Sequence, residues 1–507
     1  MKTNKLKSKV EYGDFQTPLS LATKVVNLIK ELGCEPSSVL EPTCGLGSFI
    51  TASLRKFPSI KKIVGRDVNK NYIETLSEKF KNDSRVDVSV SDFFETDWDE
   101  ILEGLSPSLL IMGNPPWVTN SELSAFDSQN LPIKNNLKKH LGIDAITGSS
   151  NFDISEWMLL KMFEWARAQK AVVAMLVKTT VARKTLLDEW KSHSDCGQAK
   201  LFEIDALSDF GVSVDACLLV YNFTSFGEKE CEVYKNLSVS SQVACFGYED
   251  RQLIANVTLY KKTKSFQNIT KNKNYRWRSG IKHDASKVME LQRTANSYTN
   301  NLGEIVDIED DFVFPMMKSS DLANNTDIHR FMLVTQHAIG EETKHIRSLA
   351  PKTWGYLIQH RKYFEKRKSS IYKNKPPFSI FGVGSYSFSL WKVAISGLYK
   401  KLHFQVVEPH EGKPVVLDDT CYFLACDNEN EARTIATLLN SQTAIDFFSS
   451  FIFWDSKRPI TAKVLNKLNI TSLAKQLQAN DVISAKQYQS YLAKPQQLAL
   501  LEQQAGY

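Results

Sequence analysis

The chain has 507 residues, of which 42% are hydrophobic and 24% charged, and its net charge is +6. This composition is typical of a folded globular protein and excludes disorder as the main state. No apolar run reaches the roughly 20 residues that a membrane helix needs. The basic start MKTNKLKSKV is followed by no apolar signal core. We therefore expect neither membrane contact nor secretion.

Charge is distributed unevenly along the chain. Residues 1–240 hold 28 Lys and Arg against 32 Asp and Glu, whereas residues 241–507 hold 35 against 25. This split predicts a catalytic domain over residues 1–240 and a domain over residues 241–507 that meets a polyanion. The eight scattered cysteines form no CxxC pair and no zinc spacing, so we expect free thiols and no metal site.

Short apolar runs alternate with stretches of helical period through the first 225 residues. We expect strands at residues 38–40, 62–66, 86–90, 109–112, 171–177 and 216–221, and helices at 19–32, 72–80 and 154–168. This alternation predicts an α/β fold with a parallel sheet covered on both faces. After residue 223 the chain becomes polar and mixed, which we interpret as the end of the first domain or a linker. The tail from about residue 471 is expected to be helical.

The sharpest local feature is VLEPTCGLGSFI at residues 39–50, where an apolar run enters Glu41 and then Gly45 and Gly47. Ligands of open α/β sheets lie beyond the carboxyl ends of strands, and glycine allows a close approach to the backbone. Asp67 follows the next apolar run, where a carboxylate can accept hydrogen bonds from two ribose hydroxyls. A glutamate beside a pyrophosphate would repel it. The pattern therefore favours a nucleoside with a positive group, such as S-adenosylmethionine, over a dinucleotide.

A further acid, Asp92, comes 25 residues after Asp67 at the end of the third apolar run. Its carboxylate can accept from an adenine amine, with Phe93 against the ring. Either acid alone is as well explained as a helix cap or a turn residue. Both at successive strand ends, after a glycine turn, favour a nucleoside site.

The fourth apolar run ends directly in Asn114, Pro115, Pro116 and Trp117. The two prolines fix φ and remove two backbone donors, so the loop is stiff and presents bare carbonyls. The amide oxygen of Asn114 and the carbonyl of Pro115 can then accept from one NH₂ group, whose lone pair stays available to attack a methyl sulfonium. Trp117 can stack on the base that bears the amine. Such a site works mainly by positioning and electrostatics.

Taken in order, YGDFQTP at residues 12–18, the glycine turn, Asp67, Asp92 and the NPPW tetrapeptide resemble the γ-class adenine-specific DNA methyltransferases of bacterial restriction–modification systems. The resemblance implies a Rossmann-like, S-adenosylmethionine-dependent methyltransferase domain with a mixed sheet. A C-terminal α+β target recognition domain with a helical tail would follow it. It also implies a cytoplasmic prokaryotic enzyme that methylates the 6-amino group of an adenine flipped out of double-stranded DNA. Its partner would be a cognate restriction endonuclease or another defence-system subunit.

The same resemblance assigns roles to individual residues. The expected cofactor-binding residues are Thr17, Pro18, Glu41, Gly45, Gly47, Asp67, Asp92 and Phe93. The expected catalytic loop is Asn114, Pro115, Pro116 and Trp117, although Tyr or Phe is commoner than Trp at the last position. Phe210 falls where the family places a second aromatic ring against the flipped base, and a plain core phenylalanine explains it equally well.

The back half mixes basic and aromatic residues. Its candidate DNA contacts are Arg276, Arg278, Lys457 and Arg458. Such side chains neutralise phosphates or read base edges. Any one of these clusters is also explained as a solvated face, but their concentration in one half argues that at least one contacts DNA.

Two other functions fit part of the pattern. Loops of the Asn-Pro-Pro-aromatic kind also occur in enzymes that methylate protein glutamine amides and in some RNA methyltransferases, although glutamine methylation needs no large basic second domain. A non-catalytic DNA-binding scaffold is the other alternative, and the intact acids and Asn114 argue against it. No pair of acids with a lysine indicates a nuclease, so we expect a stand-alone modification enzyme or the methyltransferase subunit of a larger system.

Overall fold

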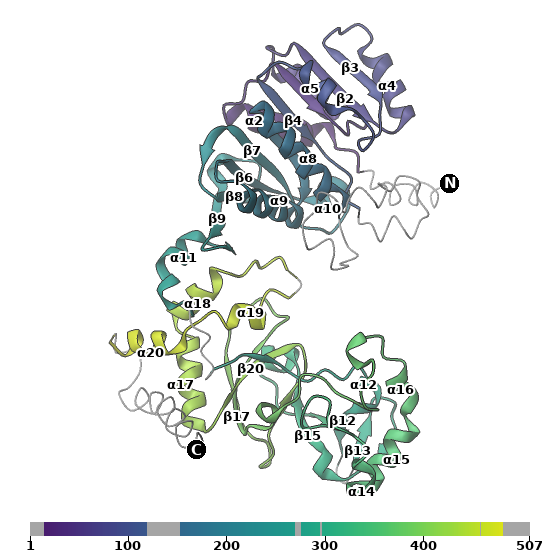
Figure 1. Cartoon of the computed structure of the whole chain (residues 1–507), viewed down its shortest axis with the longest axis vertical. Helices are drawn as coiled ribbons and strands as arrows, with labels where there is room; N and C mark the ends of the chain where they lie inside the picture. The colour runs from purple at the N-terminus through teal and green to yellow at the C-terminus, as the bar shows by residue number, and fades with distance from the viewer. Residues whose placement is uncertain (1–14, 119–152, 269–274, 295–296, 457, 480–507) are drawn as a thin grey trace, which may run out of the picture. The chain divides into compact units, whose positions relative to one another are not determined.

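The computed structural model describes residues 15–118, 153–268, 275–294, 297–456 and 458–479. The chain divides into two compact units, residues 1–257 and 258–507 (Figure 1). Among the described residues, no helix combines the length and the apolar character that crossing a bilayer requires. All eight cysteines are free thiols, as expected.

The first unit is built on a ten-stranded mixed sheet with the order β10-β9-β8-β6-β7-β5-β4-β1-β2-β3. Its strands are β1 Ser38–Glu41, β2 Lys62–Asp67, β3 Val86–Val90, β4 Leu109–Gly113, β5 Val172–Lys178, β6 Cys196–Ile204, β7 Ala216–Gly227, β8 Glu230–Tyr234, β9 Gln242–Glu249 and β10 Gln252–Ile254. Strands β1 to β5 are parallel, whereas β7 runs antiparallel between β5 and β6. The short link from β6 to β7 carries only helix α10 (Ala206–Phe210), which is too little chain for a parallel crossover. The α/β prediction is confirmed, and so is the mixed sheet that the resemblance implies. The parallel sheet expected from the alternation is found in β1 to β5 and in the pair β6 and β8, whereas β7 and β9 run antiparallel to their neighbours.

Helices cover both faces of this sheet. Helices α2 (Leu19–Glu31) and α3 (Ser48–Lys56) share one hydrophobic core with side chains of β1, β4 and β5. Helices α8 (Ile154–Gln169) and α9 (Thr179–Ser192) contact β5 with side chains outside that core. Helices α4 (Lys70–Phe80) and α5 (Trp98–Glu103) flank β3 in the sequence. Both faces of the sheet are therefore buried under helices. A ligand can reach the sheet only where the strands end.

The first unit extends past the predicted boundary at residue 240. Strand β8 pairs with β6, and β9 and β10 continue the sheet to Ile254. The polar stretch after residue 223 therefore belongs to the end of the first unit, which is one of the two interpretations, and is not a linker. Its mixed composition has a physical reason, since β9 lies near the edge of the sheet and is only partly buried.

The second unit contains two sheets, with the orders β14-β13-β12-β16-β15-β19 and β11-β20-β17-β18. Their strands are β11 Arg278–Ser279, β12 Glu290–Arg293, β13 Tyr298–Asn300, β14 Ile305–Val306, β15 Val313–Met317, β16 Arg330–Leu333, β17 Trp391–Ser396, β18 Gln405–Val407, β19 Val416–Leu417 and β20 Cys421–Cys426. The longer helices are α15 (Pro351–Gln359), α17 (Glu429–Leu439), α18 (Gln442–Ser449) and α20 (Ile470–Ala479). Helix α20 agrees with the expected helical tail, whose residues 480–507 lie outside the described part.

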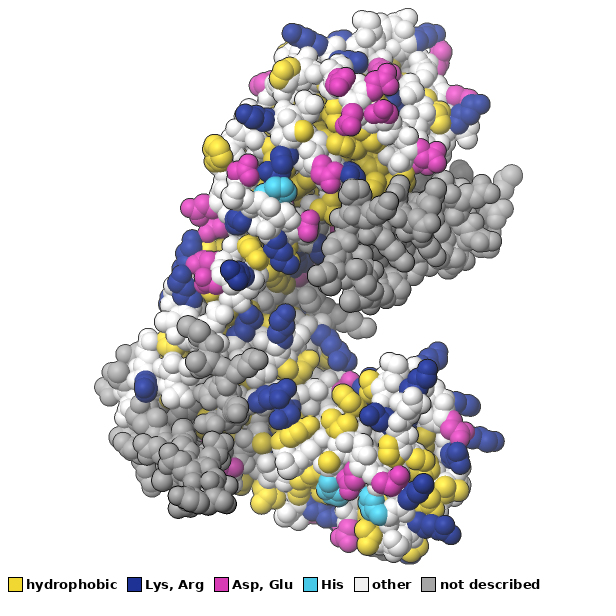
Figure 2. All heavy atoms as spheres, in the orientation of Figure 1, with side chains coloured by type: hydrophobic (Ala, Val, Ile, Leu, Met, Phe, Trp, Pro, Cys, Tyr) yellow, Lys and Arg dark blue, Asp and Glu magenta, His cyan; other side chains and the backbone are white. Residues whose placement is uncertain are grey.

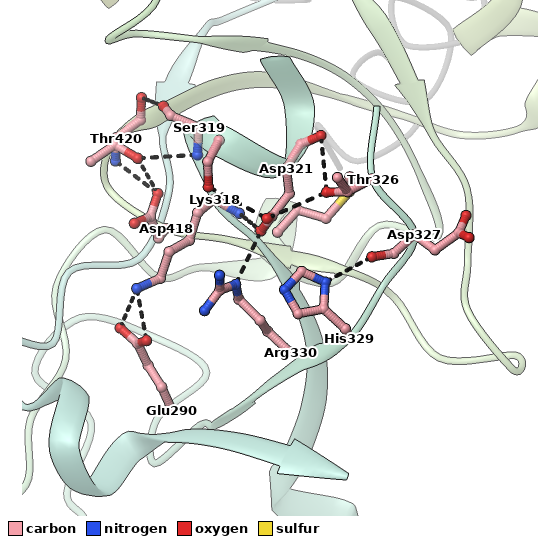
Figure 3. Close-up of polar contacts among 12 residues, drawn as sticks. Glu290, Lys318, Ser319, Asp321, Thr326, Asp327, His329, Arg330, Asp418 and Thr420 are labelled. Carbon is pink, nitrogen blue, oxygen red and sulfur yellow. Dashed lines mark hydrogen bonds and ion pairs between the residues drawn. The ribbon is translucent and has the colours of Figure 1, made fainter. Parts of the chain in front are cut away.

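A polar network links the two sheets of the second unit (Figure 3). At the start of helix α13 (Ser319–Asn324), the Ser319 hydroxyl donates to the carbonyl of Thr420, just before β20, at 2.6 Å. The neighbouring Lys318 ammonium donates to both carboxylate oxygens of Glu290 in β12, each at 2.7 Å. These bonds satisfy buried polar groups and fix the two sheets against each other.

Candidate active site

Four polar side chains follow successive parallel strands of the first unit. Glu41 ends β1, Asp67 ends β2, Asp92 lies two residues beyond β3, and Asn114 directly follows β4. Carboxyl ends of parallel strands meet at one edge of a sheet, which is where open α/β folds bind ligands. All four residues line a cavity of about 400 Å³, a size typical of small-molecule sites.

The glycine turn, whose Gly45 lines the cavity, is held by Asp67. Its two carboxylate oxygens accept from the backbone N–H groups of Gly45 and Asn69, each at 2.8 Å. Gly45 and Gly47 have φ of +49° and +68°, which only glycine adopts readily. Gly45 and Asp67 line the cavity, whereas Gly47 is the residue before α3 and is not part of the wall.

Glu41 places a buried carboxyl group on the cavity wall. Only 2% of the residue is exposed, and its Oε2 is buried without a hydrogen-bond partner among the described residues. Burial, reinforced by the charge of Asp67, raises the pKa of Glu41 well above its ordinary value. A buried carboxyl with an unsatisfied oxygen is costly, and a cationic ligand group would relieve that cost.

Another part of the cavity wall combines an acid with aromatic rings. Asp92 Oδ1 accepts from the backbone N–H of Phe94 at 2.7 Å. Phe93 and Phe94 both line the cavity, and their rings lie 5.5 Å apart. Phe93 also packs 5.3 Å from Trp98. The predicted Asp92 and Phe93 are thus brought together on the wall. Phe94 was not predicted, although it lies in the same SDFFE segment.

Asn114 presents an unused acceptor. Its Nδ2 donates to the backbone carbonyl of Phe15 at 2.9 Å, whereas its Oδ1 is buried without a partner among the described residues. The donation to Phe15 fixes which end of the amide is the nitrogen, so the oxygen is the atom left to accept a hydrogen bond. Pro116 lines the cavity beside Asn114, and Pro115 is buried outside its wall.

Trp117 lies deeper than a stacking platform would. It is 5% exposed, its indole N–H donates to the carbonyl of Leu176 at 3.2 Å, and it is not among the residues that line the cavity. Its ring lies 5.2 Å from Phe210 and 6.0 Å from Phe15. The stacking roles of Trp117 and Phe210 stay predictions. Phe15, which was not predicted as a site residue, lines the cavity and packs with these two rings.

The segment before α2 closes one side of the cavity. Thr17 lines the wall, and its carbonyl accepts from the Ser48 hydroxyl at 2.7 Å. Gln16, which was not predicted, lines the wall and accepts at Oε1 from the backbone N–H of Leu46 at 2.9 Å. Pro18 directly precedes α2 and is not a wall residue.

Thr43 is a further wall residue that the motif reasoning passed over. It stands between Glu41 and the glycines, and its buried Oγ1 has no partner among the described residues. The signal was present in the sequence, since Thr43 is the one hydroxyl within the turn EPTCGLG.

The predicted DNA contacts belong to the second unit. Arg276 and Arg458 are exposed, and Lys457 lies outside the described residues. The guanidinium of Arg278 lies 4.0 Å from the ring centre of Tyr386, a cation–π contact. On the face shown in Figure 2, Lys and Arg side chains of this unit are scattered among apolar and acidic ones rather than gathered in one stripe.

The amino-acid sequence is similar to those of known type II methyltransferases. No family model matches the chain. Type II methyltransferase M.NspV of Nostoc sp. is 48% identical over 476 residues, which cover 92% of this chain and 98% of that protein. Type II methyltransferase M.CvrRI of Paramecium bursaria Chlorella virus XZ-6E is 32% identical over 132 residues, 26% of this chain and 31% of that protein.

Among solved structures, the type IIL restriction-modification enzyme MmeI in complex with DNA is similar with a TM-score of 0.52 and 13% identity, over 93% of this chain and 67% of that chain. This likeness confirms the predicted fold class, a Rossmann-like methyltransferase sheet. The match to M.NspV extends across nearly all of both proteins. The chain therefore belongs to the type II methyltransferases.

Proposed function

We propose that the protein transfers a methyl group from S-adenosylmethionine to the 6-amino group of an adenine flipped out of duplex DNA, as a γ-class modification enzyme of a restriction–modification system. The observation that carries the proposal is the Oδ1 of Asn114, which has no hydrogen-bond partner among the described residues and belongs to a cavity wall that three strand-end acids share. An amide oxygen held in this way is suited to accept from an exocyclic amine.

The cavity fits S-adenosylmethionine by the chemistry of its wall. Glu41 offers an unsatisfied carboxylate oxygen to the amino group, and the turn at Gly45 allows a close approach to the backbone. Asp67 would hold the ribose, and Asp92 the adenine beside Phe93. When bound, the cofactor supplies an electrophilic methyl group.

The chain's own residues then hold the target amine. Asn114 Oδ1 accepts one N–H, and the carbonyl of Pro115 is the proposed second acceptor. An amine gripped by two acceptors keeps its lone pair out of conjugation with the ring. Catalysis is then positioning and electrostatics rather than general-base chemistry. Trp117, Phe210 and Phe15 are the aromatic residues proposed to meet the base once it leaves the stack.

The second unit is the proposed target recognition domain, and the first the catalytic domain. An amine inside a stacked duplex is out of reach, so a separate surface must hold the DNA while the base is rotated out. Arg276, Arg278, Lys457 and Arg458 are proposed for that surface. Arg278 supports the assignment, because its guanidinium stacks on Tyr386 and has no acidic partner among the described residues. The similar structure of MmeI was solved in complex with DNA, which supports DNA as the ligand to test.

The test is transfer of a tritiated methyl group from S-adenosylmethionine to duplex DNA, followed by digestion and chromatography of the nucleosides. We expect label in N6-methyladenine. Label in a methylated cytosine would refute adenine specificity. In parallel reactions with RNA or protein in place of DNA, label in RNA or in protein glutamine and none in DNA would refute DNA as the substrate. Expression in a methylation-deficient host, with single-molecule sequencing, then identifies the methylated site.

A further inference from the structure

We propose that residues 15–17 form a bridge that couples cofactor binding to the target-amine acceptor, with Gln16 as the positioning residue. The inference rests on the proposed function, because the two ligands that it couples are S-adenosylmethionine and the target adenine. It adds a role for a side chain that neither the motifs nor the comparisons assign.

Each residue of the bridge forms a hydrogen bond to a different residue in or beside the cavity wall. The Phe15 carbonyl accepts from Asn114 Nδ2 at 2.9 Å, which fixes the amide of the amine acceptor. The Gln16 side chain accepts from the Leu46 N–H at 2.9 Å, and the Thr17 carbonyl accepts from Ser48 Oγ at 2.7 Å. Leu46 belongs to the glycine turn and Ser48 begins α3. Three consecutive residues thus connect the turn to the amide.

Gln16 is the side chain through which the turn meets the bridge. It lies so close over Gly45 that a Cβ there would come within 2.5 Å of Gln16 Oε1. Gln16 also lines the cavity, so a ligand in the cavity contacts the turn and Gln16 together. Ordering of the turn by the ligand therefore orders Gln16, and with it the adjoining Phe15 carbonyl.

The Phe15 carbonyl decides which end of the Asn114 amide is available. While that carbonyl holds Nδ2, the unpaired atom is the oxygen, which can accept from an amine. If the bridge shifts, the amide can rotate and present its NH₂ group, which cannot accept from an amine. Bound cofactor should therefore raise the affinity for the target adenine. By thermodynamic linkage, bound adenine should raise the affinity for the cofactor by the same factor.

The experiment measures the Kd of a duplex carrying the methylation site, with and without saturating S-adenosylhomocysteine. For the wild-type protein we expect about fivefold tighter DNA binding with the analogue, the scale that one hydrogen bond supplies. The ratio of the DNA Kd without the analogue to the DNA Kd with it should fall close to one in Gln16→Ala and in Gln16→Met, whose side chain is of similar length. Gln16→Glu keeps an acceptor for the Leu46 N–H, so most of the wild-type ratio should be retained.

Asp92→Ala is the matched control, since it should weaken analogue binding at a wall residue outside the bridge and keep the ratio at saturation. A ratio near one in the wild-type protein, or a full ratio in folded Gln16→Met, overturns the bridge. A lost ratio in Asp92→Ala also overturns it. Failure of the proposed function is seen separately, as wild-type protein that places no methyl group on DNA adenine.

Discussion

Replacing Asn114 by alanine is the most direct test of the amine acceptor. The change removes the donor held by the Phe15 carbonyl and the unpaired Oδ1 at once. A hydrogen bond to a group that gains charge contributes about 1.5–3 kcal/mol. Lost positioning of the amine adds to it. Together they predict a rate of methyl transfer about 10²–10³-fold lower.

The assay is single-turnover methyl transfer to duplex DNA at saturating cofactor, with calorimetry of the cofactor alone. Among the described residues, no hydrogen bond joins Asn114 to the glycine turn or to the strand-end acids, so the cofactor Kd should change less than about threefold. An Asn114→Ala protein that transfers methyl groups within about tenfold of the wild-type rate would refute the acceptor role. So would a loss explained wholly by weaker cofactor binding.

Asn114→Asp sharpens the same test. An ionised carboxylate would place an oxygen where Nδ2 now donates to the Phe15 carbonyl, and the two oxygens would repel each other. A protonated carboxyl donates there and leaves its other oxygen to accept, which reproduces the arrangement of asparagine. The relative activity of Asn114→Asp should therefore rise as the pH falls, measured against the wild-type protein at each pH.

Three further predictions concern the turn and the acids. Gly47→Ala adds a Cβ within 2.6 Å of the buried Leu76 at φ +68°, and it should lower the free energy of unfolding by about 2–5 kcal/mol. The control is Gly211→Ala, at a similar φ of +74° but with open space for the added Cβ, where chemical denaturation should show a loss of only about 1–2 kcal/mol in the free energy of unfolding. Burial and the charge of Asp67 raise the pKa of Glu41, so the cofactor-free fold favours the protonated carboxyl and loses that stability as the pH rises through the raised pKa. A cation binds the ionised form, so cofactor binding below that pKa should release a proton, seen by calorimetry in two buffers and absent in Glu41→Gln. Asp67→Ala should weaken cofactor binding at least tenfold, because the turn loses its anchor and the ribose its acceptor; unchanged affinity would remove the ribose assignment.

Much of the first unit could be predicted because local pattern determines it. Buried parallel strands are continuous apolar runs, and runs that end in Glu41, Asp67, Asp92 and Asn114 mark the edge where such strands meet. The glycine turn could also be predicted from the sequence, since the positive φ at Gly45 and Gly47 requires glycine. The last strands of the sheet could not be predicted, because β9 and β10 are partly exposed and their polar composition matches that of a loop.

The sequence by itself therefore determined the chemistry of the site: three acids, an amide and a glycine turn at successive strand ends. Only the tertiary structure decided which atoms are already paired. Phe15 holds the Asn114 amide across 99 positions of the chain, and Gln16 holds the turn across 30. It also buried Trp117 against Phe210 and left one oxygen of Glu41 unsatisfied. Such contacts depend on how distant segments pack, and no local pattern of residue types records them.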